Sequence, residues 1–351
     1  MPAKIPATVV TGFLGAGKTT LIRHMLENAN GKRIALIVNE FGDVGVDGEI
    51  LKGCGDAACS DDDIMELSNG CICCTVADEF IPTMEKLLAR PEPPDHIVIE
   101  TSGLALPQPL VRAFGWPEIA TRVTVDGVIT VLDGKAVEEG LFAHSPEAVN
   151  AQRAADENLD HETPLSELFE DQIAAADMIV VNKADLMADA DALVSDLRMK
   201  ARPGVQVVKS TMGALPLDVL LGQGAAAESD LESRHELHHH HHHDDDDDHH
   251  DHEHGHDEFE TFALALGEIT DPAAYAGQLG QVIRDHSILR LKGFAAVAGK
   301  PMRLAIQAVG PRIEHYFDRP FAPEEPRETR LVVIGMAGLD RAAISEALEP
   351  R

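Results

Sequence analysis

The chain has 351 residues, enough for roughly two or three domains with ordinary hydrophobic cores. Its 60 Asp and Glu residues against 29 Lys and Arg residues give a formal net charge of −31, which excludes general binding to nucleic acid or anionic membranes. No apolar run reaches the roughly 18 residues that cross a bilayer, and the N-terminus lacks the pattern of a signal peptide. We therefore expect a soluble, cytoplasmic protein.

The first two thirds of the chain predict one α/β domain. From residue 5 to about 222, short apolar runs alternate with amphipathic stretches, which is typical of βα units and a mostly parallel sheet. The predicted strands are 6–11, 33–39, 96–100, 127–133, 178–182 and 205–210. The predicted helices are 19–28, 76–89, 146–158, 165–175 and 189–200. We assign this domain to residues 1–223.

A glycine-rich loop follows the first predicted strand and leads into a predicted helix. In this context GFLGAGKTT fits the phosphate-binding pattern G-x-x-x-x-G-K-[ST]. Backbone N–H groups of such a loop wrap the phosphates, Lys18 reaches the β and γ oxygens, and the Thr19 hydroxyl binds Mg²⁺. The alternative is an ordinary glycine turn. The expected nucleotide-binding residues of this loop are Gly12, Gly15, Ala16, Gly17, Lys18, Thr19 and Thr20, with Lys18 also catalytic.

All five cysteines lie within a short segment between the second and third predicted strands. Cys71, Cys73 and Cys74 form C-x-C-C, which differs from the C-x₂-C knuckle of structural zinc sites. Three thiolates this close can converge on one metal ion and leave a fourth position for Glu40, water or another side chain. The alternative is that they pack as small buried hydrophobes. The roles of Cys54 and Cys59 stay open between extra ligands, a relay and surface thiols.

The third predicted strand ends at Glu100, the first residue of the sequence ETSG. Because carboxyl ends of parallel strands border the ligand crevice, we expect Glu100 beside the P-loop, binding Mg²⁺ or orienting the attacking water. The backbone N–H of Gly103 is then expected to sense the γ-phosphate. The alternative is an ordinary acidic residue at a strand end.

The strand MIVVN runs into an N-K-x-D sequence. Asn182, Lys183 and Asp185 are therefore candidates for base recognition. A carboxylate at Asp185 accepts both the ring N–H and the amino group of guanine, a pair that adenine does not offer. This favours GTP over ATP. The alternative is that Asn182 caps a helix and Lys183 is a solvated lysine.

A polar segment separates the first domain from the rest of the chain. Residues 224–258 lose apolar periodicity, which predicts a disordered linker. Within it, residues 235–256 hold 12 of the 18 histidines among eight acids, so we favour a metal reservoir over a merely solvated linker. Residues 259–351 predict a smaller α+β domain with strands 259–269, 287–298, 302–309 and 328–335 and helices 272–284 and 340–348.

Taken in order, TVVTGFLGAGKTT, VNEFG, GCICC, ETSG and NKAD resemble the CobW/HypB/UreG family of P-loop GTPases, and within it the CobW group of metallochaperones. RLKGFAAV, GKPMRL and YFDRPF look like the C-terminal domain of that group. The resemblance implies a GTPase that uses GTP and Mg²⁺ to deliver Co²⁺ to an aerobic cobalt chelatase in cobalamin synthesis. It also implies Cys71, Cys73 and Cys74 as metal ligands, with Glu40 nearby.

Relatives with the same motif handle Zn²⁺, so a zinc-transfer GTPase delivering to another acceptor is the alternative. Two further hypotheses are a metal store based on the histidines and a GTPase with a structural zinc. Our main hypothesis is a switch in which Mg²⁺-GTP orders residues 40–47 beside the thiols and hydrolysis releases the metal. The oligomeric state stays open, with a homodimer as one expectation.

Overall fold

The computed structural model describes residues 4–39, 64–67, 80–155, 164–222, 225, 227, 259–310, 312–322 and 325–350. It contains two compact units, the first within residues 1–246 and the second within residues 247–351. The histidine-rich run at residues 235–256 lies outside the described residues. No described helix is both long enough and apolar enough to cross a membrane.

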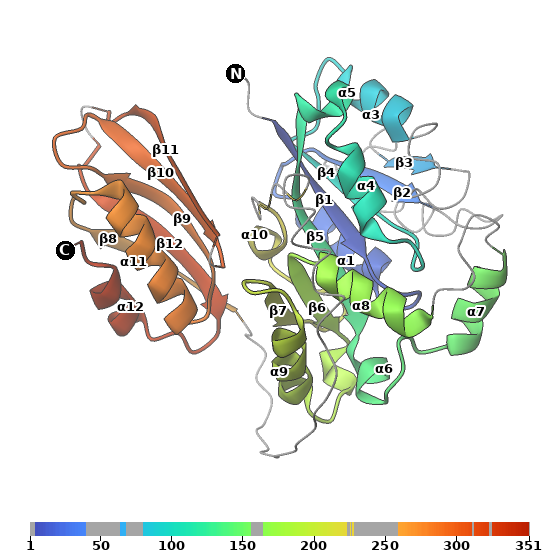
Figure 1. Ribbon diagram of the computed structural model, residues 1–351. Coiled ribbons are helices and arrows are strands. Elements are labelled where there is room, and N and C mark those ends of the chain that lie inside the picture. Colours follow the sequence, from blue (N-terminus) through green and yellow to red (C-terminus); the bar gives the residue numbers. More distant parts are fainter. Residues whose placement is uncertain are drawn as a thin grey trace. The chain divides into compact units, whose positions relative to one another are not determined.

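A seven-stranded parallel sheet forms the centre of the first unit (Figure 1). Its strand order is β3-β2-β4-β1-β5-β6-β7. The strands are β1 Ile5–Thr11, β2 Ile34–Asn39, β3 Ile64–Leu67, β4 His96–Glu100, β5 Val123–Asp133, β6 Met178–Asn182 and β7 Gln206–Lys209. Every residue of β4 and β6 is buried, as expected for parallel strands that are covered on both faces.

Helices cover both faces of this sheet, with α4 and α8 in front of it and α1 behind it in Figure 1. The helices are α1 Lys18–Glu27, α3 Ile81–Leu88, α4 Pro107–Ala113, α5 Pro117–Ala120, α6 Gly134–Glu138, α7 Pro146–Ala155, α8 Leu165–Ala175, η3 Ala184–Leu186, α9 Ala190–Lys200 and α10 Leu217–Leu220. Helix α1 buries Leu21, Ile22 and Met25, which recur on one helical face. The predicted α/β fold with a mostly parallel sheet is therefore confirmed.

The position of β1 determines where a ligand site forms. The chain leaves β1 through α1 and β2, yet β1 is hydrogen-bonded to β4 on one side and β5 on the other. In open α/β sheets the crevice at the carboxyl ends of the strands, where the strand order reverses, is the usual ligand site. The candidate site residues of the three sequence motifs lie at or just after the carboxyl ends of β1, β4 and β6.

Strand β5 begins at Val123 and is longer than the predicted strand 127–133. The prediction began too late because the sequence Asp126-Gly127 has the composition of a turn. In the structure the register between β1 and β5 shifts at this point, and the extra residue is Asp126. Its carboxylate is buried, accepts a 2.5 Å hydrogen bond from Gly222 N and lies 3.5 Å from Thr8 Oγ1. A long-range contact thus keeps a turn-forming residue inside a strand.

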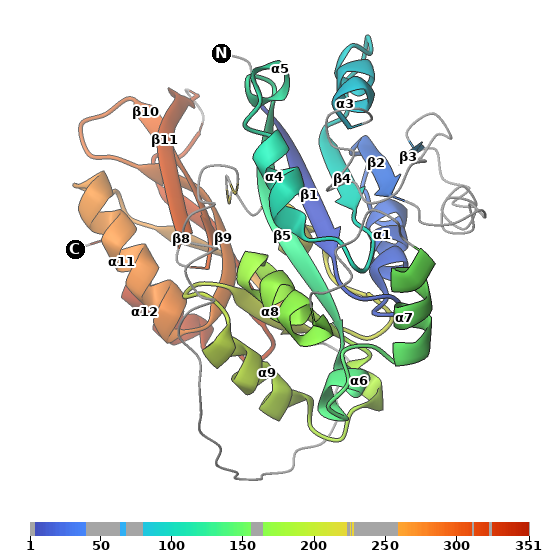
Figure 2. The ribbon, with the colours of Figure 1, turned by 45° about the vertical axis from the view of Figure 1, so that its right-hand side comes forward.

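The second unit is a five-stranded antiparallel sheet with two helices packed on one face (Figures 1 and 2). The strand order is β11-β10-β9-β12-β8. The elements are β8 Phe259–Leu266, α11 Pro272–Asp285, β9 Ile288–Ala296, β10 Met302–Val309, β11 Arg312–Pro320, β12 Thr329–Met336 and α12 Arg341–Leu348. Asp271 and Asp340 cap the two helices by accepting backbone N–H groups. The predicted smaller α+β domain is confirmed.

Strand β11 was not predicted from the sequence. Residues 314–320 of this edge strand are exposed, so they show no alternation of apolar and polar side chains. The strand is held by backbone pairing with β10, in which Gln307 faces Glu314 and Ala305 faces Tyr316. Strand β3, at one edge of the seven-stranded sheet, was also missed from the sequence. Its four residues are too few to show a periodic pattern.

Candidate functional site

The loop between β1 and α1 has the conformation that its glycines make available. Gly12, Gly15 and Gly17 have φ angles of 135°, 79° and 100°, which other residues rarely adopt. Added Cβ atoms would lie 2.1 Å from Val131 O at Gly12 and 2.2 Å from Asn182 Nδ2 at Gly17. Two of the three glycines therefore meet a steric requirement as well as a conformational one.

Lys18 begins α1 and turns back over this loop. Its side chain is buried, and its Nζ donates to Gly12 O at 2.8 Å and to Phe13 O at 3.4 Å. The ammonium group is thereby held against the backbone of the loop that is expected to bind phosphate. Gly15 is exposed at the loop surface, Ala16 N donates to Phe13 O, and Thr20 is half-buried on α1.

Thr19 and Glu100 meet across the carboxyl edge of the sheet. The Thr19 hydroxyl donates to Glu100 Oε1 at 3.3 Å, and Glu100 is buried at the end of β4. A hydroxyl and a carboxylate next to a phosphate-binding loop are the oxygen donors that suit Mg²⁺, which keeps several waters and takes few protein ligands. The residues present therefore fit a magnesium ion.

Gly103 lies directly against the phosphate-binding loop. An added Cβ would approach Leu14 N to 2.7 Å and Phe13 C to 3.1 Å, so only glycine permits this contact without movement. The segment before it is fixed by Thr101 N, which donates to Val10 O at 3.0 Å. The structure thus brings the predicted γ-phosphate contact and the loop together.

The three residues of the N-K-x-D sequence lie in different environments. Asn182 is buried at the end of β6 and its Nδ2 donates to Ala16 O at 2.9 Å. Lys183 has a left-handed conformation, and its Nζ lies 2.5 Å from the buried carboxylate of Asp133. Asp185 is exposed in η3. Asn182 therefore supports the phosphate loop, while Asp185 remains accessible to a base.

A loop after β7 belongs to the same site and was missed from the sequence. Gly213 N donates to Asn182 Oδ1 at 3.1 Å, and Ala184 N donates to Ser210 O at 3.1 Å. The loop thus contacts both sides of the N-K-x-D turn. Its only sequence signal is the Ser-Thr pair that follows Lys209 at the end of β7, which matches no motif that we used.

The expected metal-transfer residues Glu40, Cys71, Cys73 and Cys74 lie outside the described residues, as do Cys54 and Cys59. Within the part of the chain that the structure describes, no three His, Cys, Asp or Glu side chains gather to hold a metal ion. The C-x-C-C ligand set therefore stays a prediction.

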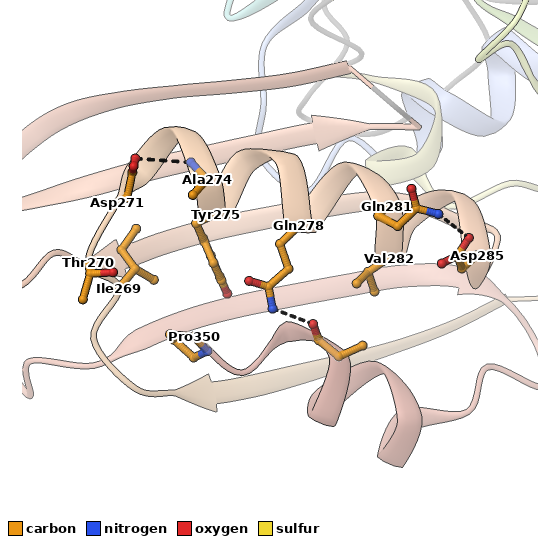
Figure 3. Close-up of a pocket in the computed structure, with 11 residues that line it drawn as sticks. Ile269, Thr270, Asp271, Ala274, Tyr275, Gln278, Gln281, Val282, Asp285 and Pro350 are labelled. Atoms are coloured by element: carbon orange, nitrogen blue, oxygen red, sulfur yellow. Dashed lines mark hydrogen bonds between the residues drawn. The ribbon is translucent and has the colours of Figure 1, made fainter.

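A groove of about 440 Å³ lies in the second unit, beside α11 and the end of the chain (Figure 3). Two of its polar side chains join these elements. Gln278 Nε2 donates to Ala347 O and Glu349 O, and the Tyr275 hydroxyl donates to Leu348 O at 3.0 Å. Burial raises the pKa of Tyr275, so this hydroxyl stays protonated. The groove is a seam between α11 and α12 with no group assembled for chemistry.

The glycines allow a matched test of the loop. Gly12→Ala is expected to lower the free energy of unfolding by about 3 kcal/mol or more, because the added Cβ meets a backbone carbonyl that side-chain movement cannot clear. Gly15→Ala also has a positive φ, but an added Cβ meets nothing within 4 Å, so we expect a loss of about 1 kcal/mol. Urea unfolding of both variants measures the difference, and equal losses would contradict the steric argument.

Comparisons with known proteins agree with this geometry. Residues 6–209 match the CobW/HypB/UreG nucleotide-binding domain, and residues 259–350 match the cobalamin synthesis protein cobW C-terminal domain. The chain is 57% identical over 351 residues to the zinc chaperone CobW of a Sinorhizobium species, covering 98% of this chain and 96% of that protein. Identity to the zinc chaperone CobW of Pseudomonas aeruginosa is 53% over 357 residues, covering 99% and 91%. Identity to the zinc chaperone YjiA of Escherichia coli is 31% over 341 residues, covering 95% and 94%.

Proposed function

Because the chain belongs to the CobW/HypB/UreG family and is a P-loop GTPase, we propose that its GTP cycle loads a metal ion and transfers it to an acceptor protein. The observation that carries this proposal is the contact between Thr19 and Glu100 beside the buried Lys18 ammonium. It assembles a hydroxyl, a carboxylate and a cation at one end of the sheet, as magnesium-dependent nucleotide hydrolysis requires.

The residues of this site divide the work of hydrolysis. Lys18 neutralises charge on the β and γ oxygens, and the loop backbone from Gly12 to Thr20 holds the phosphates. Thr19 and Glu100 hold Mg²⁺, which supplies charge stabilisation at the phosphates when it is bound. The alternative role of Glu100 is to orient the attacking water, and Gly103 contacts the γ-phosphate. Asp185 accepts hydrogen bonds from guanine, with Asn182 and Lys183 supporting the turn that carries it.

The cargo that we propose is Zn²⁺, bound by Cys71, Cys73 and Cys74 with Glu40 as an additional ligand. Two lines of support favour zinc. Three relatives that span more than nine tenths of this chain are named zinc chaperones. In addition, thiolate sites hold Zn²⁺ more tightly than Co²⁺ in the Irving–Williams order.

Co²⁺ delivered to a cobalt chelatase is the second candidate. It is supported by the match of residues 259–350 to a domain described as that of a cobalamin synthesis protein. Cobalt loading at thiolates requires that geometry, nucleotide state or low available zinc overcome the usual preference. A competitive titration of Zn²⁺ and Co²⁺ distinguishes the two candidates.

Chain order suggests how the nucleotide controls the metal. Strands β2 and β4 are hydrogen-bonded neighbours, and β4 carries Glu100 at its end. Glu40 follows β2 directly, and the three cysteines lie between β3 and α3. Binding of the γ-phosphate to Gly103 and ordering of residues 40–47 would complete the metal site, and hydrolysis would release the ion.

Metal titration tests this switch. Zn²⁺ and Co²⁺ are titrated competitively into the reduced protein with Mg²⁺ and either a non-hydrolysable GTP analogue or GDP, and the thiolate-to-Co²⁺ absorption is recorded. We expect one tight site whose affinity rises by about 5- to 150-fold with the triphosphate, the usual range of coupling between two sites. Replacing the three cysteines of C-x-C-C by serine should remove this site.

Two outcomes would contradict the switch. Equal affinity with both nucleotides removes the coupling, and a serine variant that still binds tightly removes the thiolate site. Deleting residues 238–256 provides the control, because a chaperone keeps its single tight site while a histidine-based store loses most of its capacity. Metal that stays bound throughout the GTP cycle, with unfolding on its removal, would indicate a structural zinc instead.

A further inference from the structure

The backbone carbonyl of Gly103 accepts a hydrogen bond from a buried glutamine. Gln172 Nε2 on α8 donates to Gly103 O at 3.1 Å, across 69 positions of sequence. Because glycine has the freest backbone of all residues, a hydrogen bond to its carbonyl restricts the orientation of the adjoining peptides. Gly103 thus contacts the loop near Leu14 N through its Cα and Gln172 through its carbonyl.

Gln172 is itself anchored to the central sheet. Its side chain is fully buried, and its backbone carbonyl accepts a hydrogen bond from the Thr130 hydroxyl on β5 at 2.8 Å. The buried Gln172 Oε1 has no hydrogen-bond partner among the described residues. Leaving a buried amide oxygen unpaired costs free energy, so packing alone would favour methionine or leucine here. The bond to Gly103 is what the amide contributes.

The same helix contacts the phosphate-binding loop through aromatic rings. Phe169 on α8 lies 6.3 Å from Phe13 of the loop and 5.3 Å from Phe142, measured between ring centroids. Leu104, next to Gly103, belongs to the same apolar cluster as Leu168. Helix α8 therefore packs against the loop and the segment that contains Gly103, and movement of either one shifts its contacts.

We propose that Gln172 is a positioning residue that sets the discrimination between nucleoside triphosphate and diphosphate. It holds Gly103 in the orientation in which that residue contacts the terminal phosphate, and it transmits this contact to α8. The inference rests on the proposed function, because it takes Gly103 as the γ-phosphate contact. A diphosphate does not reach Gly103, so its binding does not depend on Gln172.

Nucleotide binding by Gln172→Met measures this role. Methionine has a similar length and volume but no amide, so the bond to Gly103 O is lost while the packing is kept. We expect the affinity for a non-hydrolysable GTP analogue with Mg²⁺ to fall by about three- to tenfold, the usual effect of one hydrogen bond. The affinity for GDP should stay within about twofold, because a diphosphate does not reach Gly103.

Gln152→Met is the matched control. Gln152 lies on α7, which packs with α8 through Val149 and Leu168, and its Oε1 is likewise buried without a hydrogen-bond partner in the described part of the chain. The same substitution there should change neither affinity. Hydrogen exchange gives a second readout: the triphosphate should protect amides of α8 more than GDP does in the parent protein, and this difference should vanish in Gln172→Met.

Equal weakening of both nucleotides, or no change in either, would overturn the inference. A parent protein that binds no nucleotide would overturn the proposed function as well, whereas normal discrimination in both the parent and the variant removes only the role of Gln172. If Gln172→Met does not fold, Gln172→Leu replaces it. Leucine is also apolar and lacks the amide donor, so we expect the same selective loss.

Discussion

Replacing Lys18 by methionine is expected to lower the affinity for Mg²⁺-GTP by roughly 100-fold and to abolish measurable GTP hydrolysis. Methionine keeps the apolar stem and removes only the ammonium, which lies 2.8 Å from Gly12 O at the mouth of the loop. Charge-assisted hydrogen bonds to phosphate are about twice as strong as neutral ones, and charge on the γ-phosphate oxygens grows during transfer. Calorimetry and phosphate release measure the two effects.

Arg23→Met is the matched control for this change. Arg23 lies on the same helix and loses the same positive charge on substitution, but its side chain is 41% exposed and pairs with Glu27 one turn away. Surface pairs of this kind contribute little, so nucleotide affinity should stay unchanged. Circular dichroism confirms that both variants are folded. A Lys18→Met protein that hydrolyses GTP normally would show that this loop is not the catalytic phosphate site.

Changing Asp185 to asparagine is expected to lower GTP affinity by about 100- to 10,000-fold and to create binding of xanthosine triphosphate. The carboxylate accepts two hydrogen bonds from guanine, whereas asparagine keeps one acceptor oxygen and sets an N–H donor against the second guanine donor. Asparagine offers an N–H donor to the carbonyl oxygen that xanthine has in place of the guanine amino group. Because Asp185 is exposed in η3, the substitution should not disturb folding.

Asp191→Asn provides the comparison. Asp191 lies six positions further along, in the first turn of α9, with 82% of its side chain exposed, and its carboxylate contacts Lys209. This substitution removes the same charge from the same region, but outside the N-K-x-D sequence that is expected to contact the base. It should change the affinity for neither GTP nor xanthosine triphosphate. Competition of GTP, ATP and xanthosine triphosphate against a labelled GTP analogue gives all three values in one experiment. Unchanged GTP affinity in Asp185→Asn would place base recognition elsewhere.

The sequence alone determined the features that depend on neighbouring residues. Gly12, Gly17, Lys18 and Thr19 lie within eight positions, so their spacing and the flanking apolar strand were enough to predict the loop and the helix after it. Buried runs such as MIVVN predicted the parallel strands, because a strand covered on both faces must be apolar throughout. The position of Glu100 beside Thr19 also followed, since parallel strands end at a common edge.

The tertiary structure decided which distant residues meet. Asn182 joins Ala16 O and Gly213 N, Gln172 reaches Gly103 O, and Asp126 within β5 accepts a hydrogen bond from Gly222 N. Each contact spans more than 30 positions, and neither helical nor strand periodicity contains information about such pairs. Strand β11 shows the same limit, because its exposed side chains leave only backbone pairing to define it. Local spacing therefore fixes the chemistry of the phosphate loop, whereas long-range hydrogen bonding fixes what supports it.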